Sequence, residues 1–196
     1  MPPARSVEIG ADRIVTPDWD CLFRARKGDE AAWRELAECF QPRLTALALV
    51  ITRSATAAED IVQETFLRAH RSRLSNTDGS LGGYLGTIAY RLAVKESQHA
   101  RRQTETFTRD AADDTSNPLE RLLTSERDRL VAAAVASLDD CHRDVLLLRF
   151  YGDHSYDQIA RLLQIPVGTV KSRMFHAVRS CRELLCQQGV LNATYR

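Results

Sequence analysis

Hydrophobic positions recur at helical spacing along most of the chain, and the alternating pattern of β-strands is almost absent. Two blocks carry this periodicity, residues 19–90 and residues 126–185. Between them, residues 97–125 are polar, include Asn117-Pro118 and lack a sustained apolar face. The pattern predicts an all-α protein in which a flexible linker joins two small helical domains.

Local signals predict the helices of the first block. Pro42 is expected to end one helix and open the next, because proline suits the first turn of a helix. Thr56 and Glu59 have the spacing of a capping box, which predicts a helix over residues 57–73. A glycine-containing loop then leads to a further helix over about residues 84–98.

The second block begins with two expected helices, over residues 126–137 and residues 139–151. Their apolar positions should form the core of a second, small domain. The predicted core residues are Leu138, Val145, Leu146, Leu148 and Phe150.

Residues 155–182, SYDQIARLLQIPVGTVKSRMFHAVRSCR, indicate a helix, a sharp turn and a second helix. Ser155 is expected to cap the first helix and Thr169 the second, while Gln164 occupies a turn position where a positive φ is common. The second helix carries basic side chains at helical spacing and no acidic residue before position 183, which suits the major groove of DNA. These side chains are Lys171, Arg173, His176, Arg179 and Arg182.

Composition limits how such a protein would bind DNA. The 27 basic and 26 acidic residues give a net charge of +1, so the chain lacks the positive field of a nonspecific DNA binder, and its DNA affinity is expected to depend on a partner. No apolar run reaches the length of a membrane span and no signal core begins the chain, which predicts a cytoplasmic protein.

The five cysteines form no CxxC pair and are expected to be reduced thiols. A zinc site built from Cys141, His142, Cys181 and Cys186 would have poor ligand spacing on helices. A thiol or metal enzyme using Cys141 and His142 lacks an evident third orienting group. We therefore expect no catalytic residue, no metal and no cofactor, although redox sensing by a thiol stays open.

Three motifs in order resemble the bacterial RNA polymerase sigma factors of the extracytoplasmic-function (ECF) type. They are Lys27-Gly28-Asp29 with Ala32-Trp33, then AEDIVQETFLRA at residues 58–69, then PVGTVKSR at residues 166–173. The resemblance implies a factor that gives core RNA polymerase its promoter choice, assists promoter opening and does no covalent chemistry.

The resemblance also implies a domain organisation. Residues 19–96 would be sigma region 2, residues 97–125 the linker, and residues 126–188 sigma region 4 with its helix-turn-helix. Residues 1–18 would be an extension, disordered or regulatory, and residues 189–196 a tail.

Polymerase binding is implied for the helix around residues 58–69. In the family this helix docks on the clamp helices of the largest polymerase subunit, which makes Asp60, Gln63, Glu64 and Leu67 the candidate contacts, with Val62 as a further apolar one. The same residues would also suit a solvated acidic helix face. The resemblance further implies that region 4 meets the polymerase flap and that an anti-sigma factor holds the protein, in the cytoplasm or at the inner membrane; it implies no small-molecule substrate.

The loop at residues 74–83 and the helix after it match the part of the family that opens the -10 element. Tyr84, Tyr90, Arg91 and Lys95 are the candidate contacts for the extruded strand, since single-strand capture needs aromatic surfaces and cations. Tyr84 would equally suit a core position. This chain has Tyr84-Leu85 where the family usually has Trp-Leu, and Arg91 where Asn is common.

Promoter reading at the -35 element is implied for the second helix of the helix-turn-helix. The candidate readers are Thr169, Lys171, Ser172, Arg173, Phe175, His176 and Arg179. Some of them would contact only phosphates, which position the protein without specifying sequence. His176 replaces an Arg common in the family and makes that contact a candidate for pH dependence.

A second hypothesis is a two-domain helix-turn-helix regulator that binds operators without polymerase. The AEDIVQETFLRA motif favours the sigma factor hypothesis over this one.

Overall fold

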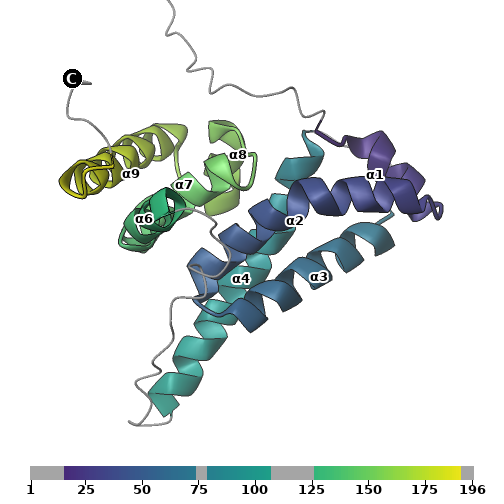
Figure 1. Cartoon of the computed structure of the whole chain (residues 1–196), viewed down its shortest axis with the longest axis horizontal. Helices are drawn as coiled ribbons and strands as arrows, with labels where there is room; N and C mark the ends of the chain where they lie inside the picture. The colour runs from purple at the N-terminus through teal and green to yellow at the C-terminus, as the bar shows by residue number, and fades with distance from the viewer. Residues whose placement is uncertain (1–15, 74–78, 107–125, 191–196) are drawn as a thin grey trace, which may run out of the picture.

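The computed structural model describes residues 16–73, 79–106 and 126–190, and every regular element in these ranges is an α-helix (Figure 1). The first group comprises α1 (Trp19–Arg26), α2 (Glu30–Thr52), α3 (Ala55–Arg71) and α4 (Leu81–Thr106). The second comprises α6 (Glu126–Ala136), α7 (Asp140–Phe150), α8 (Tyr156–Leu163) and α9 (Val167–Gln187). The all-α prediction with two helical groups is confirmed.

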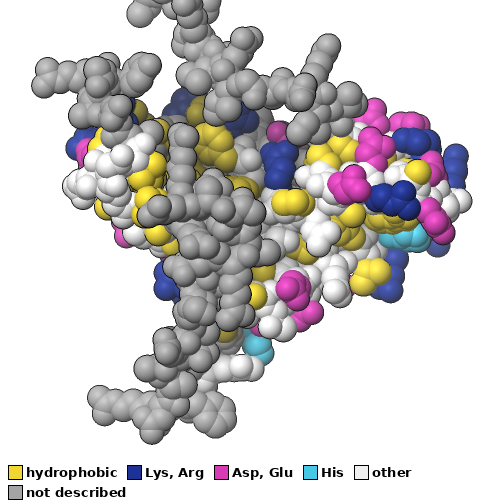
Figure 2. Space-filling view, in the orientation of Figure 1, with side chains coloured by type: hydrophobic (Ala, Val, Ile, Leu, Met, Phe, Trp, Pro, Cys, Tyr) yellow, Lys and Arg dark blue, Asp and Glu magenta, His cyan; other side chains and the backbone are white. Residues whose placement is uncertain are grey.

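In the first group α2, α3 and α4 pack against one another, and α1 packs against α2 (Figure 1). Side-chain caps begin three of its helices: Asp18 accepts from Cys21 N, Asp29 from Ala32 N, and Ser54 from Ala57 N. The leucines buried almost completely are Leu22, Leu36, Leu44, Leu47, Leu49, Leu81 and Leu85. On the surface, acidic and basic side chains are interspersed over the end formed by α1, α2 and α3 (Figure 2).

Two local predictions in this group are wrong. Pro42 lies inside the continuous helix α2 and opens no new helix. An interior proline costs about 3 kcal/mol, but Phe40 and Leu44 on either side of it are fully buried, so packing outweighs that cost. The capping box of Thr56 and Glu59 also fails, because Ser54 caps α3 two residues earlier.

Helix α4 continues to Thr106, past the predicted end near Gln98. The added turns have no apolar face: Gln98 and His99 and the residues at 100–103 are exposed. Alanine, arginine and glutamine favour helix without needing burial, which is why a polar sequence extends α4 here. Residues 107–125, the rest of the predicted linker, lie outside the described residues.

The second group contains the predicted helix-turn-helix, formed by α8 and α9. Ser155 and Gln158 make a reciprocal capping box at the start of α8, and Gln164 adopts a left-handed φ of 56° at its end, as predicted. Thr169 caps nothing, because α9 begins at Val167 directly after Pro166. Of the predicted core residues, Leu138, Val145, Leu146 and Leu148 are buried, but Phe150 is 57% exposed at the last position of α7.

The two groups meet along a seam between α4 and the end of α7. Gly86 and Gly152 allow this close approach, since a Cβ on Gly86 would lie 2.6 Å from Gly152 Cα. The hydroxyl of Tyr90 donates to Asp144 at 2.9 Å across the seam. His154 lies with its Nε2 2.8 Å from the hydroxyl of Thr87.

Stability should depend on pH through His154. Burial lowers the pKa of this imidazole, whose Nδ1 donates to the Leu148 carbonyl, while the nearby Asp153 carboxylate opposes the shift. The unfolded chain therefore takes up this proton first, and the free energy of unfolding should fall as pH drops below about 6.5. Chemical denaturation between pH 8 and pH 5 measures this effect.

The control is His154→Gln, in which the free energy of unfolding should change less with pH over the same range. Asp144, whose pKa is raised by burial, acts with the opposite sign as pH falls, but it contributes to both proteins and cancels in the comparison. Parallel curves for the two proteins would contradict the assignment to His154.

Candidate functional site

The exposed side of α3 carries the residues predicted to bind polymerase. Asp60, Gln63 and Leu67 are exposed, and Glu64 is half-buried and pairs with Arg68 at 2.7 Å. Spacings of three, four and seven residues place Asp60, Gln63, Glu64 and Leu67 on one stripe, called here the α3 surface. It offers carboxylates, an amide and an apolar side chain to a partner helix.

The structure corrects one member of this set and adds another. Val62, predicted as an apolar contact, is 5% exposed and belongs to the core. Lys95, predicted for the -10 strand, lines a shallow groove between α3 and α4 together with Asp60 and Glu64. The structure therefore places a cation beside the α3 surface, which the sequence could not show because the two helices meet only in the fold.

The -10 candidates on α4 divide between two faces. Tyr84, Arg91 and Lys95 are separated by seven and eleven residues and share one face of the helix. Arg91 and Lys95 are exposed, while the ring of Tyr84 is half-buried against Trp19, with centroids 5.1 Å apart. Tyr90 lies on a different face, 8% exposed in the seam and bonded to Asp144.

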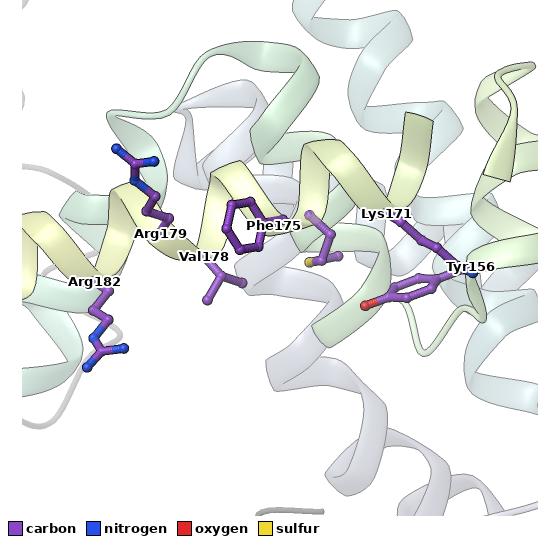
Figure 3. Close-up of a pocket in the computed structure, with 7 residues that line it drawn as sticks. Tyr156, Lys171, Phe175, Val178, Arg179 and Arg182 are labelled. Carbon is purple, nitrogen blue, oxygen red and sulfur yellow. The ribbon is translucent and has the colours of Figure 1, made fainter. Parts of the chain in front are cut away.

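The -35 candidates lie along α9. Lys171, Phe175 and Arg179 line a groove with Val178 and Arg182, and Tyr156 from α8 closes one end (Figure 3). Phe175 is 65% exposed, an unusual position for phenylalanine on a protein surface. Cations around an exposed apolar centre suit DNA, where Lys and Arg bond guanine edges or phosphates and apolar groups contact thymine methyls. These residues are called here the α9 surface.

The remaining -35 candidates differ in accessibility. Ser172 and His176 are exposed, whereas Thr169 and Arg173 are half-buried. Arg173 lies near Asp144. Burial raises the pKa of Asp144, and the hydrogen bond from Tyr90 and the charges of Arg143 and Arg173 offset only part of that rise. Arg173 is thus partly engaged within the protein.

Sequence reasoning missed three residues that line this groove, namely Tyr156, the buried Met174 and Val178. Val178 had a local signal, because it follows Phe175 by one helical turn. Tyr156 had none, since its place depends on how α8 packs against α9. Arg179 pairs with Glu183 at 2.8 Å, an exposed ion pair that costs little to exchange for a phosphate contact.

The cysteines of the described residues do not form a metal site or a catalytic relay. No three His, Cys, Asp or Glu side chains in these ranges gather closely enough to hold a metal ion. Cys141 Sγ and Asp139 Oδ2 each lie 3.8 Å from the same nitrogen of His142, Nδ1, so the ring cannot pass a proton between them. Burial and Glu35 raise the pKa of Cys21 to about 11, which disfavours its reactive thiolate.

Known proteins resemble this chain over both helical groups. The family described as Sigma-70 region 2 matches residues 36–105, and the family described as Sigma-70, region 4 matches residues 134–183. The ECF RNA polymerase sigma factor SigL of Mycobacterium tuberculosis is 35% identical over 176 residues, covering 85% of this chain and 96% of SigL. The RNA polymerase sigma-H factor of Pseudomonas aeruginosa is 30% identical over 175 residues, covering 82% and 89%.

Two solved structures share the fold. CnrH, solved in complex with the cytosolic domain of CnrY, has a TM-score of 0.56 at 21% identity and covers 87% of this chain and 97% of CnrH. The sigma factor RpoE from Bartonella quintana, solved with the anti-sigma factor NepR, has a TM-score of 0.57 at 23% identity and covers 79% and 96%. Within the described ranges, no helix combines the length and the apolar character needed to span a bilayer.

Proposed function

This chain belongs to the ECF family of RNA polymerase sigma factors, and from that premise we propose how its surfaces divide the work of promoter recognition. Sigma factors are non-enzymatic polymerase subunits that direct RNA polymerase to promoters in transcription initiation. In our proposal residues 19–96 act as region 2, residues 97–125 as the linker and residues 126–188 as region 4. The exposed α3 and α9 surfaces carry this proposal, because each overlaps a motif of the family and most of their side chains are exposed among the described residues.

The α3 surface binds the clamp helices of the largest polymerase subunit. Its acidic and amide groups can pair with arginines of a partner helix, and Leu67, which is 46% exposed, provides an apolar contact at the centre of such an interface. Lys95 in the adjacent groove would pair with an acidic group of the same partner. In region 4, the polymerase flap is the proposed second contact.

The N-terminal half of α4 contacts the opened non-template strand of the -10 element. The half-buried ring of Tyr84 packs against Trp19, and the exposed Arg91 supplies a cation on the same face of α4. Tyr90 joins this surface only when the seam opens, because its hydroxyl is bonded to Asp144 in the closed arrangement.

The α9 surface reads the -35 element in the major groove. The first turns of a recognition helix reach base edges, which assigns base contacts to Lys171, Ser172 and Phe175. Arg179 and Arg182, further along the helix, are assigned to phosphates. His176 is exposed between these two sets.

An anti-sigma factor is the proposed regulator. CnrH, which shares this fold, was solved in complex with the cytosolic domain of CnrY, and RpoE, which also shares it, was solved with the anti-sigma factor NepR. The protein acts in the cytoplasm, where polymerase and promoters are found, and an anti-sigma partner anchored in the inner membrane would hold it there.

In vitro transcription from a genomic promoter library tests the proposed function. Core RNA polymerase with this protein should produce start sites that core polymerase alone does not, and these promoters should share two spaced upstream motifs. DNA binding by the protein alone, without new start sites, would contradict the proposal and favour an operator-binding regulator.

A further inference from the structure

Arg26 of helix α1 contacts the end of α3. Arg26 donates from Nε and Nη2 to the carbonyl of Ala69, at 3.0 Å and 2.6 Å. Ala69 lies in the last turn of α3, where backbone carbonyls have no partner within the helix. Forty-three residues separate the two in sequence, so α1 fixes the point at which the chain leaves α3.

The same helix contacts the start of α4 through a tryptophan. The indole N–H of Trp19 donates to the carbonyl of Gly79 at 2.9 Å, and its ring packs on Tyr84. Gly79 has a φ of 111°, a conformation that favours glycine, and the next residue, Ser80, accepts from Gly83 N at the beginning of α4. Trp19 therefore fixes the point at which the chain enters α4.

Phe23 joins these two contacts into one face of α1. It stacks on Trp19 with centroids 6.5 Å apart, and the guanidinium of Arg26 lies 5.5 Å from the centre of its ring. Trp19, Phe23 and Arg26 are four and three residues apart and so lie on one side of the helix. We call these three residues the α1 brace.

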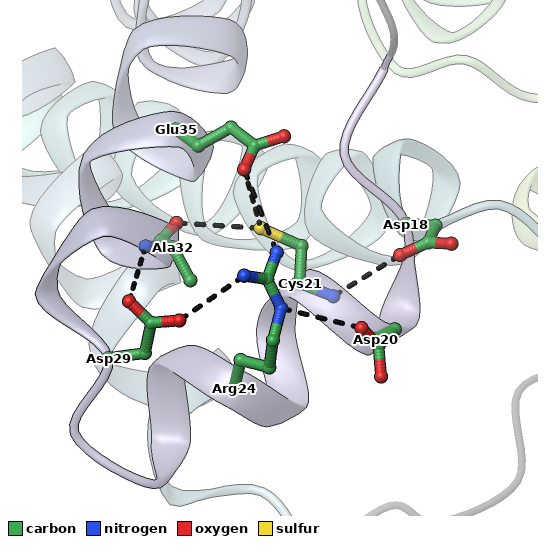
Figure 4. Close-up of polar contacts among 7 residues, drawn as sticks. All are labelled: Asp18, Asp20, Cys21, Arg24, Asp29, Ala32 and Glu35. Carbon is green, nitrogen blue, oxygen red and sulfur yellow. Dashed lines mark hydrogen bonds and ion pairs between the residues drawn. The ribbon is translucent and has the colours of Figure 1, made fainter.

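The opposite side of α1 is tied to α2, which gives the brace a fixed base. Arg24 reaches Asp29 and Glu35 at 3.2 Å and 3.8 Å, and the thiol of Cys21 lies 3.5 Å from the Ala32 carbonyl (Figure 4). Leu22 and Ala25 of α1 are almost fully buried. A short helix seated in this way can hold two distant chain points at a set separation.

We propose that the α1 brace is a positioning element for -10 strand capture: by holding Ala69 and Gly79, it sets the two ends of the connection between α3 and α4. The proposal rests on the proposed function, which assigns the N-terminal half of α4, with Tyr84 and Arg91, to the -10 element. The brace residues touch no DNA themselves. They act through the Gly79 carbonyl, the Tyr84 ring and the last turn of α3.

If the brace only stabilised the fold, its loss would weaken polymerase binding, -35 duplex binding and -10 strand binding equally. If it positions the -10 site, its loss weakens -10 strand binding alone. Removing a single neutral hydrogen bond changes an equilibrium by about threefold to tenfold. Trp19→Phe removes one such hydrogen bond and should weaken binding of the opened -10 strand by this factor. Polymerase binding is assigned to the α3 surface and duplex binding to the α9 surface, and neither surface includes the brace partners Ala69, Gly79 and Tyr84.

The experiment uses holoenzyme reconstituted with each variant and two fluorescent probes from a promoter identified by transcription. One probe is a fork whose non-template -10 strand is single, and the other is a duplex bearing only the -35 element. Trp19→Phe and Arg26→Gln should each bind the fork about threefold to tenfold more weakly, while Arg26→Lys, which keeps one cationic donor, recovers part of the loss. Affinity for the -35 duplex and for core polymerase should stay unchanged.

Arg34→Gln is the matched control, since it removes an exposed arginine of α2 that belongs neither to the brace nor to its base, and it should leave fork binding intact. Unchanged fork binding in both Trp19→Phe and Arg26→Gln would overturn the inference, as would equal losses on the two probes. A wild-type holoenzyme that binds the fork no better than the -35 duplex would overturn the proposed function itself, and this inference with it.

Discussion

Replacing Asp60 and Gln63 together by alanine is expected to weaken binding to core RNA polymerase about thirtyfold or more. Both side chains are exposed on the α3 surface, and neither contributes to the core. Charged and polar residues at the centre of an interface cost about 2 kcal/mol or more when truncated, which corresponds to that factor in Kd. The measurement is a titration of labelled protein with core polymerase.

Glu38→Ala provides the matched control for this prediction. Glu38 is equally exposed and acidic, but it lies on α2 and outside the α3 surface, so its loss should leave polymerase affinity unchanged. Circular dichroism should show the same helix content in both variants. Wild-type polymerase affinity in the double variant would remove Asp60 and Gln63 from the interface.

The second large effect is expected from Lys171→Ala at the -35 element. Lys171 lies exposed in the second turn of α9 and lines the groove with Phe175. Loss of a base contact costs about 1–3 kcal/mol, so the holoenzyme should bind its cognate -35 duplex about 5- to 150-fold more weakly. The preference for that sequence over a scrambled duplex should fall by a similar factor.

Arg34→Ala is the control for Lys171→Ala, because it removes one positive charge from the exposed side of α2 instead of from α9. It should leave -35 affinity unchanged. A Lys171→Ala protein that loses affinity equally for cognate and scrambled duplexes would mean that Lys171 binds a phosphate, and the slope of binding against salt should then fall by about one. Such a result would contradict the assignment of Lys171 to base reading.

Together the two variants separate the proposed roles of the helical groups. The double variant at Asp60 and Gln63 should lose affinity for polymerase and keep its intrinsic preference for the -35 sequence. Lys171→Ala should lose the preference for the -35 sequence and keep its affinity for polymerase. The half-buried Arg173 is a poorer choice for this purpose, because it lies near Asp144, and its removal would also disturb the residues at the seam.

Features that depend on neighbours in sequence were predicted well. The cap by Ser155 and the left-handed Gln164 each lie at the end of α8 that they define. The stripe of Asp60, Gln63 and Leu67 follows from helical spacing alone, once α3 is known to be a helix. Local backbone preferences and periodicity decide such features before any tertiary contact forms.

Predictions failed where packing overrode a local preference. Pro42 has a strong tendency to begin a helix, yet the buried side chains on both sides keep α2 continuous. Val62 was predicted to be exposed beside Gln63, but α2 and α4 pack against α3, and the side chain of Val62 is buried. Phe150 is apolar, but at the last position of α7 its side chain is left 57% exposed.

The sequence by itself determined the helical class, the helix-turn-helix and the three motifs that place this chain among the ECF sigma factors. Only the tertiary structure decided that Tyr90 is engaged by Asp144, that Lys95 lies beside Asp60, and that Trp19 and Arg26 hold the two ends of one connection. The physical reason is separation along the chain. Contacts between residues 35 to 60 positions apart leave no periodic trace in the sequence, since they depend on how whole helices cross rather than on the preferences of adjacent residues.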